Sequence, residues 1–150
     1  MVACASRPEE AKPAVIALHC SLSSGQQWTR LAEALVDGFE VIAPDLAGHG
    51  NNLAAPMPPT TLADEVAVLG RQIDHLAGPI HLVGHSYGGA VAFKMASSDA
   101  YASRIRSLTL IEPVLPTLLR DNPAERRLHD LFADMGTRIH VDLWNGMYME

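Results

Sequence analysis

Residues 80–90 read IHLVGHSYGGA, and this stretch decides the fold. Its first part, Ile80–Gly84, is a short apolar run of the kind that forms a buried strand. A helix is predicted to begin at Tyr87, almost without a loop between the two elements. The junction Gly84–Gly88 matches the pattern G-x-S-x-G. A chain that reverses so abruptly from strand to helix forces its middle residue, Ser86, into a strained backbone conformation.

The residue types at this junction suit a nucleophile. Side chains at positions 84 and 88 would collide with the turn, so glycine is expected at both. The turn would present the Ser86 hydroxyl at the carboxyl edge of the sheet, where open α/β folds bind ligands. The N-terminus of the following helix favours developing negative charge. The alternative is a glycine–serine turn with a purely structural role.

Strand and helix patterns alternate on both sides of this junction. Buried strands are predicted from continuous apolar runs, and helices from apolar positions at i, i+3, i+4 and i+7. Thr61 and Asp64 form a capping-box pattern at the start of the longest helix. The predicted strands cover residues 14–19, 40–43, 80–84 and 105–111, and the helices cover 25–36, 62–76 and 87–98. This order predicts an α/β fold with a mostly parallel sheet of about four strands and helices on both faces.

Three segments are expected from the changes of character along the chain. Residues 1–13 form a short polar head, and residues 14–112 form the α/β core. Residues 113–150 begin with prolines and then become helical, first from Asn122 to Met135 and again from about Thr137.

Composition excludes several classes of function. The net charge of −6 is spread along the chain without a basic stripe, so no nucleic-acid partner is expected. The longest apolar runs are only strand-sized, so no membrane partner is expected. His81 and His85 have no further ligands at metal-binding spacing, and we expect neither a metal nor a cofactor. Cys4 and Cys20 are interpreted as free thiols in a reducing compartment, which predicts a cytoplasmic protein.

Two further loops strengthen the functional interpretation. His19–Gly25 follows the first predicted strand, and Pro44–Gly50 follows the second. Together with Gly84–Gly89, in this order and spacing, they resemble the α/β-hydrolase superfamily, in particular its branch of small esterases, C–C hydrolases and cofactor-free haloperoxidases. The resemblance implies an oxyanion hole made by the backbone N–H groups of Ser21 and Tyr87. Cys20 stands where that family usually has glycine.

The resemblance also assigns catalytic roles. Ser86 would attack a carbonyl carbon, and a serine at this position argues against dehalogenases and epoxide hydrolases. The family's order is serine, then acid, then histidine. Glu112, directly after the fourth predicted strand, is the candidate acid, with a strand-end or pocket carboxylate as the alternative. Only His129 and His140 follow Ser86, and both are predicted on helices of the last segment, facing solvent.

The chain is therefore expected to hold the N-terminal part of an α/β-hydrolase and the start of its helical cap, with the triad histidine missing. The leading interpretation is a serine hydrolase acting on a small ester or related carbonyl substrate. One alternative is a C–C bond hydrolase, perhydrolase or lyase of the same fold. Another is a truncated, catalytically inactive domain that serves binding or has no function. An uncovered sheet edge would also favour self-association.

Overall fold

The computed structural model describes residues 12–52, 61–76 and 78–115, together with residues 123, 125–127, 130, 131 and 134. The chain divides into two units, Met1–Pro113 and Val114–Glu150. Of the second unit, residues 126, 127, 130, 131 and 134 are helical. Most of the two helices predicted after residue 122 lies outside the described residues, as do Cys4 and the polar head up to residue 11.

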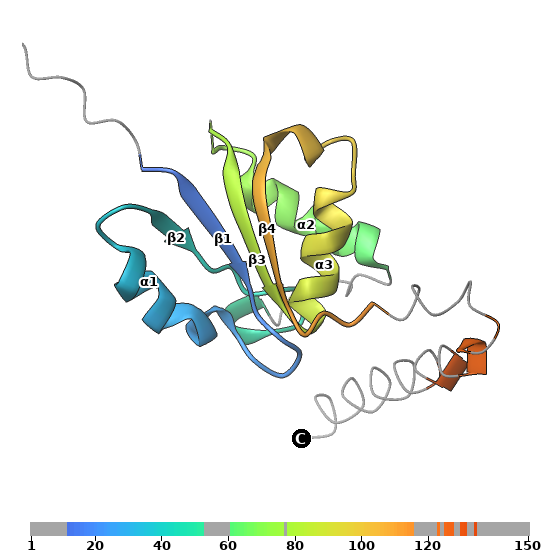
Figure 1. Ribbon diagram of the computed structural model, residues 1–150. Helices are drawn as coiled ribbons and strands as arrows, with labels where there is room; N and C mark the ends of the chain where they lie inside the picture. Colours follow the sequence, from blue (N-terminus) through green and yellow to red (C-terminus); the bar gives the residue numbers. More distant parts are fainter. Residues whose placement is uncertain are drawn as a thin grey trace, which may run out of the picture. The chain divides into compact units, whose positions relative to one another are not determined.

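Four strands of the first unit form one parallel sheet in the order β2-β1-β3-β4 (Figure 1). All five residues of β1 are buried, as its unbroken apolar run predicts for an inner strand covered on both faces. The predicted parallel sheet of about four strands is confirmed. The strands span Glu40–Ile42 (β2), Ala14–Leu18 (β1), Ile80–His85 (β3) and Ile105–Ile111 (β4).

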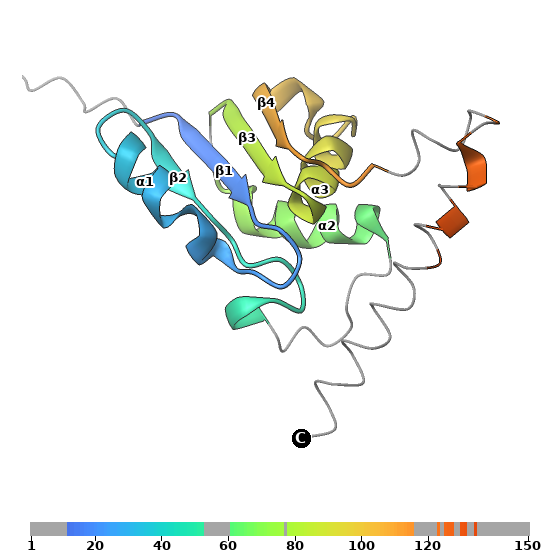
Figure 2. The same cartoon turned by 60° about the horizontal axis from the view of Figure 1, so that its bottom comes forward.

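Helices pack on both faces of this sheet. α1 (Thr29–Leu35) connects β1 to β2, whereas α2 (Leu62–Ile73) precedes β3 and α3 (Tyr87–Ala96) connects β3 to β4. The first connection runs along the sheet in the opposite direction from the others. Right-handed crossovers therefore place α1 on one face and both α2 and α3 on the other (Figure 2). The core lies between the sheet and the latter pair, and its fully buried large residues include Ile16, Leu18, Leu69, Ile73, Ile80, Leu82, Val91 and Met95.

The capping box predicted for α2 is present. The Asp64 N–H donates to Thr61 Oγ1 at 3.2 Å, and the Thr61 N–H donates to Asp64 Oδ2 at 3.1 Å. These two bonds satisfy donors that the first helical turn cannot use internally. The helix ends at Ile73, earlier than the predicted end at residue 76.

The first turn after Ser24 differs from the prediction of one α-helix over residues 25–36. Residues Gly25–Trp28 form a 3₁₀ turn (η1), and the α-helix begins only at Thr29. The cause is tertiary, because the Gly25 N–H donates to Asp45 Oδ1 at 2.7 Å. A Cβ on Gly25 would lie 2.0 Å from the Ala43 carbonyl oxygen, so the chain passes close to the loop that follows β2.

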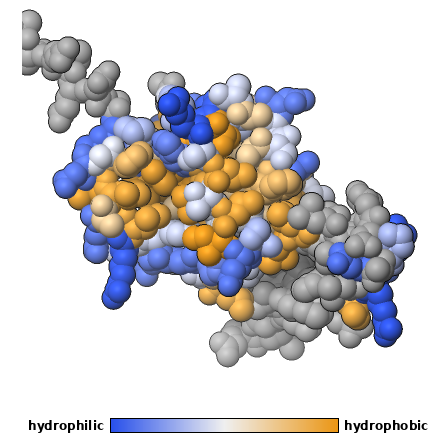
Figure 3. Space-filling view, in the orientation of Figure 1, coloured by the Kyte–Doolittle hydropathy of each residue, from blue (hydrophilic) through white to orange (hydrophobic). Residues whose placement is uncertain are grey.

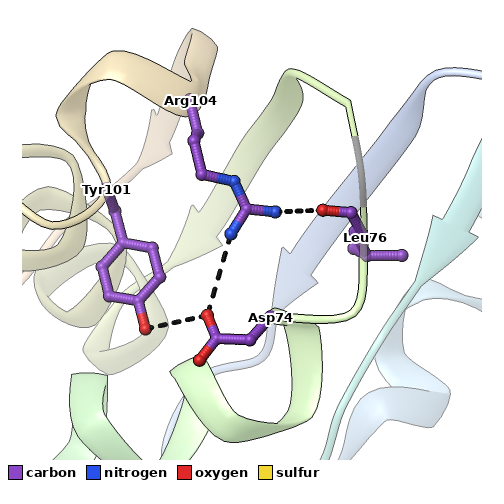
Figure 4. A network of polar contacts seen from close by, with 4 residues as sticks. All are labelled: Asp74, Leu76, Tyr101 and Arg104. Carbon is purple, nitrogen blue, oxygen red and sulfur yellow. Dashed lines mark hydrogen bonds and ion pairs between the residues drawn. The ribbon is translucent and has the colours of Figure 1, made fainter.

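A polar cluster ties the end of α2 to the turn before β4 (Figure 4). The Tyr101 hydroxyl donates to Asp74 Oδ1 at 3.2 Å, and Arg104 forms an ion pair with the same oxygen at 3.7 Å. Arg104 also donates to the Leu76 carbonyl. The cluster fixes the start of β4 at the end of the sheet opposite Ser86, so its role is structural.

β4 forms one edge of the sheet among the described strands, and its apolar residues are incompletely covered. Leu108 is 36% exposed and Ile111 is 41% exposed. Apolar surface gathers in Figure 3 where Figure 1 places β3 and β4. Within the described part of the chain, no helix is long and apolar enough to cross a membrane.

Candidate active site

Ser86 occupies a one-residue turn between β3 and α3. Its backbone dihedrals are φ 53° and ψ −113°, a region that residues with a Cβ rarely adopt. Hydrogen bonds hold the residue there on both sides. The Ser86 N–H donates to the Ile111 carbonyl at 2.9 Å, and the Ala90 N–H donates to the Ser86 carbonyl at 3.1 Å. The surrounding structure therefore enforces the strained conformation that the sequence pattern predicts.

The glycines that flank Ser86 are required by close backbone contacts. A Cβ on Gly84 would lie 2.4 Å from the Gly88 carbonyl oxygen. A Cβ on Gly88 would lie 2.4 Å from the carbonyl oxygen of His19 and 2.5 Å from that of Leu18. All three distances are too short for a real Cβ, and the obstructing atoms belong to the backbone. Glycine at position 88 therefore lets α3 begin directly against the end of β1.

Glu112 lies beside this turn in the sheet register. His85 pairs with Ile111 as the last residues of β3 and β4, so Ser86 and Glu112 both follow directly after paired positions. Glu112 also has a positive φ of 45°, and it is exposed. Its carboxylate has no hydrogen-bond partner among the described residues. The structure therefore brings the candidate acid to the same sheet edge as the candidate nucleophile.

Ser21 and Tyr87 follow the ends of the neighbouring strands β1 and β3. Tyr87 is the first residue of α3, so its N–H has no acceptor within the helix. Ser21 lies in an exposed turn, beside Leu22 with a φ of 60°. The preceding Cys20 N–H is already engaged, because it donates to Gln27 Oε1 at 3.0 Å.

His19 is a structural residue that joins the loops after β1 and β2. The Leu46 N–H donates to its Nε2 at 3.0 Å, so Nε2 carries no proton. Its Nδ1 must then carry the proton, and it donates to the Cys20 carbonyl at 2.7 Å. Burial lowers the pKa of His19, which favours this neutral form. With both nitrogens engaged, His19 cannot serve as the base for Ser86.

Asp45 is also committed to the backbone. Its two carboxylate oxygens accept from the N–H groups of Gly25 and Asn51, each at 2.7 Å. These backbone bonds lower the pKa of Asp45. The carboxylate therefore holds the loop after β2 against η1, and its role is structural.

A buried polar cluster next to Tyr87 was not predicted. Glu65 of α2 is 1% exposed, and its carboxylate accepts from the Ala47 N–H at 3.0 Å and from the Tyr87 hydroxyl at 3.3 Å. The His49 ring stacks on Tyr87 with a centroid distance of 6.4 Å. Burial raises the pKa of Glu65, and burial together with the nearby Glu65 raises that of Tyr87. One signal was present in the sequence, since Glu65 interrupts the apolar stripe of its helix.

No histidine of the described chain is hydrogen-bonded to Ser86. His81 bonds Ser107 Oγ on the sheet at 2.7 Å, and His85 bonds Gln27 at 3.0 Å. His129 and His140 lie outside the described residues. The described part of the chain likewise holds no group of three or more potential metal ligands.

Comparisons relate this chain to known lipases and esterases. The chain is 36% identical over 102 residues to lipase LipV of Mycobacterium tuberculosis, covering 67% of this chain and 37% of LipV. It is 27% identical over 123 residues to mouse monoacylglycerol lipase ABHD6, covering 80% of this chain and 36% of that protein. The solved structure of a marine microorganism esterase matches with a TM-score of 0.57 and 25% identity, covering 67% of this chain and 38% of the esterase. The chain thus spans less than two fifths of the length of these relatives.

The family assignment rests on nearly the whole chain. Residues 15–149 match the family described as the alpha/beta hydrolase family. The matched region includes the parallel sheet, the strained turn at Ser86 and the loops after β1 and β2. This chain belongs to the alpha/beta hydrolase family.

Proposed function

We propose that this chain carries the nucleophile part of a serine hydrolase that acts on a small carboxylic ester. The observation that carries the proposal is the conformation of Ser86, a strained residue held between β3 and α3 by hydrogen bonds on both sides. The lipases and esterases among its relatives support an ester as the substrate class.

In the proposed reaction, Ser86 Oγ attacks the carbonyl carbon of the ester and loses its proton to a general base. The carbonyl oxygen becomes an oxyanion, and the N–H groups of Ser21 and Tyr87 donate to it. Losing one such donor typically costs about 3 kcal/mol of transition-state stabilisation. Collapse of the tetrahedral intermediate then expels the alcohol and leaves an acyl group on Ser86, which water removes.

The proposed reaction also needs an acid and a base. Glu112 is proposed as the acid, since it follows β4 in register with Ser86 and is not engaged elsewhere among the described residues. Asp45 and Glu65 are excluded from that role because their carboxylates are already occupied, that of Asp45 by two backbone N–H groups and that of Glu65 by the Ala47 N–H and the Tyr87 hydroxyl. No described histidine is hydrogen-bonded to Ser86, and His129 and His140 are predicted to face solvent, so we expect the chain alone to react slowly.

The experiment measures labelling of Ser86 by a fluorophosphonate probe, with and without added imidazole as a substitute base. We expect slow labelling of the wild-type chain, acceleration by imidazole, and none of this in Ser86→Ala. Labelling of the chain alone at the rate of a complete lipase would refute the missing base. Equal behaviour of wild type and Ser86→Ala would refute the nucleophile and favour the inactive binding domain.

The proposed compartment is cytoplasmic. Cys20 is a free thiol, which is the usual state of cysteine in a reducing environment. A probe of cysteine oxidation on the protein isolated from its host tests this, because a disulfide through Cys20 would contradict it.

A further inference from the structure

The Gln27 side chain joins the two loops that hold the proposed oxyanion donors. Its Oε1 accepts from the Cys20 N–H at 3.0 Å, in the loop after β1. Its Nε2 bonds His85 Nδ1 at 3.0 Å, at the end of β3. We infer that Gln27 is the positioning residue that sets the distance between the Ser21 and Tyr87 donors. The inference deepens the proposed function and rests on it.

The placement of the two bonds gives this role its physical basis. Cys20 directly precedes Ser21, and His85 directly precedes Ser86. One planar amide therefore spans the gap between the loop that carries one donor and the turn that carries the nucleophile. Gln27 itself is fixed, because it lies in η1 and its own N–H donates to the Ser24 carbonyl at 3.0 Å.

The same bonds select which N–H group remains available. By engaging the Cys20 N–H, Gln27 removes it as a competitor for the oxyanion. The N–H of the next residue, Ser21, is engaged by no described residue. Misplacing a catalytic group by about 1 Å can cost on the order of a hundredfold in rate, so control of this loop matters for catalysis.

The chemistry of the amide makes the role specific to glutamine. The Cys20 N–H is a donor, so the Gln27 atom facing it must be the oxygen. The nitrogen then faces His85 and donates to Nδ1, which must be unprotonated. A glutamate at position 27 would keep the first bond and reverse the second, because a carboxylate can only accept and His85 Nδ1 would have to carry the proton. An alanine would lose both.

The test compares Gln27→Ala and Gln27→Glu with Gln26→Ala, a matched control at the exposed neighbouring position. Nitrogen-15 NMR of the full chain reports the amides of Cys20, Ser21 and Tyr87 and the ring nitrogens of His85. We expect the Cys20 amide to exchange with solvent at least about tenfold faster in Gln27→Ala, as a lost hydrogen bond predicts. The Ser21 amide should shift with it, and in Gln27→Glu only the His85 ring signal should change.

Labelling of Ser86 by the fluorophosphonate probe in the presence of imidazole supplies the functional readout. We expect the labelling rate to fall about tenfold in Gln27→Ala, less in Gln27→Glu, and not at all in Gln26→Ala. The melting temperature should be unchanged in all three variants. The inference would be overturned if the Ser21 and Cys20 amide signals of Gln27→Ala were the same as in wild type. It would also be overturned if these signals changed while Ser86 was labelled at the wild-type rate. If Gln27→Ala fails to fold, Gln27→Glu provides the test: a changed His85 ring signal with slower labelling of Ser86 would support the inference, and wild-type values of both would overturn it. If wild type never labels at Ser86, the proposed function fails, while the amide signals still show whether Gln27 holds the loop.

Discussion

Replacing Gly88 with alanine tests the close approach on which the candidate site depends. The added Cβ would lie 2.4 Å from the His19 carbonyl oxygen, so the start of α3 and the end of β1 must separate by about 1 Å to reach ordinary contact. Overpacking of this kind costs about 1–3 kcal/mol. The better helix propensity of alanine returns at most about 1 kcal/mol. We therefore expect a net loss of about 1–2 kcal/mol.

Thermal unfolding and Ser86 labelling measure the two consequences of this change. A loss of about 1–2 kcal/mol lowers the melting temperature of a domain of this size by roughly 4–8 °C. The same separation moves Tyr87 away from the loop of Ser21, so labelling with imidazole should fall by about a hundredfold.

The matched control is Gly38→Ala, where a Cβ meets no atom within 4 Å. This variant should be unchanged or more stable by up to about 1 kcal/mol, because alanine restricts the unfolded chain. If Gly88→Ala had the same melting temperature and labelling rate as Gly38→Ala, the backbone contact would impose no constraint and the reasoning would be refuted.

Three further perturbations have defined outcomes. Burial raises the pKa of Glu65 above its ordinary value of 4.5, so the contribution of Glu65 to stability is present below that value and is lost as pH rises through the folded pKa. The melting temperature of Glu65→Gln should therefore rise relative to that of wild type between pH 4.5 and 7, and a constant difference would contradict this. Backbone hydrogen bonds lower the pKa of Asp45, so the contribution of Asp45 to stability is present above the ordinary value of 3.8 and is lost as pH falls through the folded pKa. Thermal melts should therefore show that Asp45→Asn destabilises the protein at about pH 7 and has little effect at strongly acidic pH. We propose that the exposed β4 edge causes self-association, so the sedimentation coefficient of wild type should rise with protein concentration. It should not rise in Thr109→Lys, which places a charge on that edge, and a wild type that stays monomeric at all concentrations would refute the proposal.

The elements that the sequence predicts well are those determined by local signals. The buried run of β1, the capping box at Thr61 and the turn at Gly84–Gly88 each depend on residues within a few positions of one another. The 3₁₀ turn at Gly25–Trp28 was missed because its cause, the Asp45 carboxylate, lies twenty positions away in the sequence. The chain folds the predicted motifs as expected and adds long-range contacts that no periodicity encodes.

The candidate site shows the same division. Ser86 and Glu112 could be named from the sequence because each directly follows a recognisable strand. Glu65 and Gln27 could not, because their partners come from other loops. A charged residue on the apolar stripe of α2 was a usable signal for Glu65. No comparable signal existed for Gln27, whose neighbour Gln26 has the same side chain and is exposed.

The long-range contacts share one physical effect, which is to engage backbone N–H groups in the loops that follow β1 and β2. Gln27 engages that of Cys20, His19 that of Leu46, and Glu65 that of Ala47. Each of these donors lies in a loop at the carboxyl end of β1 or β2, the end of the sheet at which Ser86 follows β3. These three N–H groups are therefore not free to bind a negative charge, whereas no described residue engages the N–H groups of Ser21 and Tyr87, the proposed oxyanion donors. The loops are thereby held rigid before any substrate binds, which is the condition under which hydrogen bonds to an oxyanion lower a barrier most.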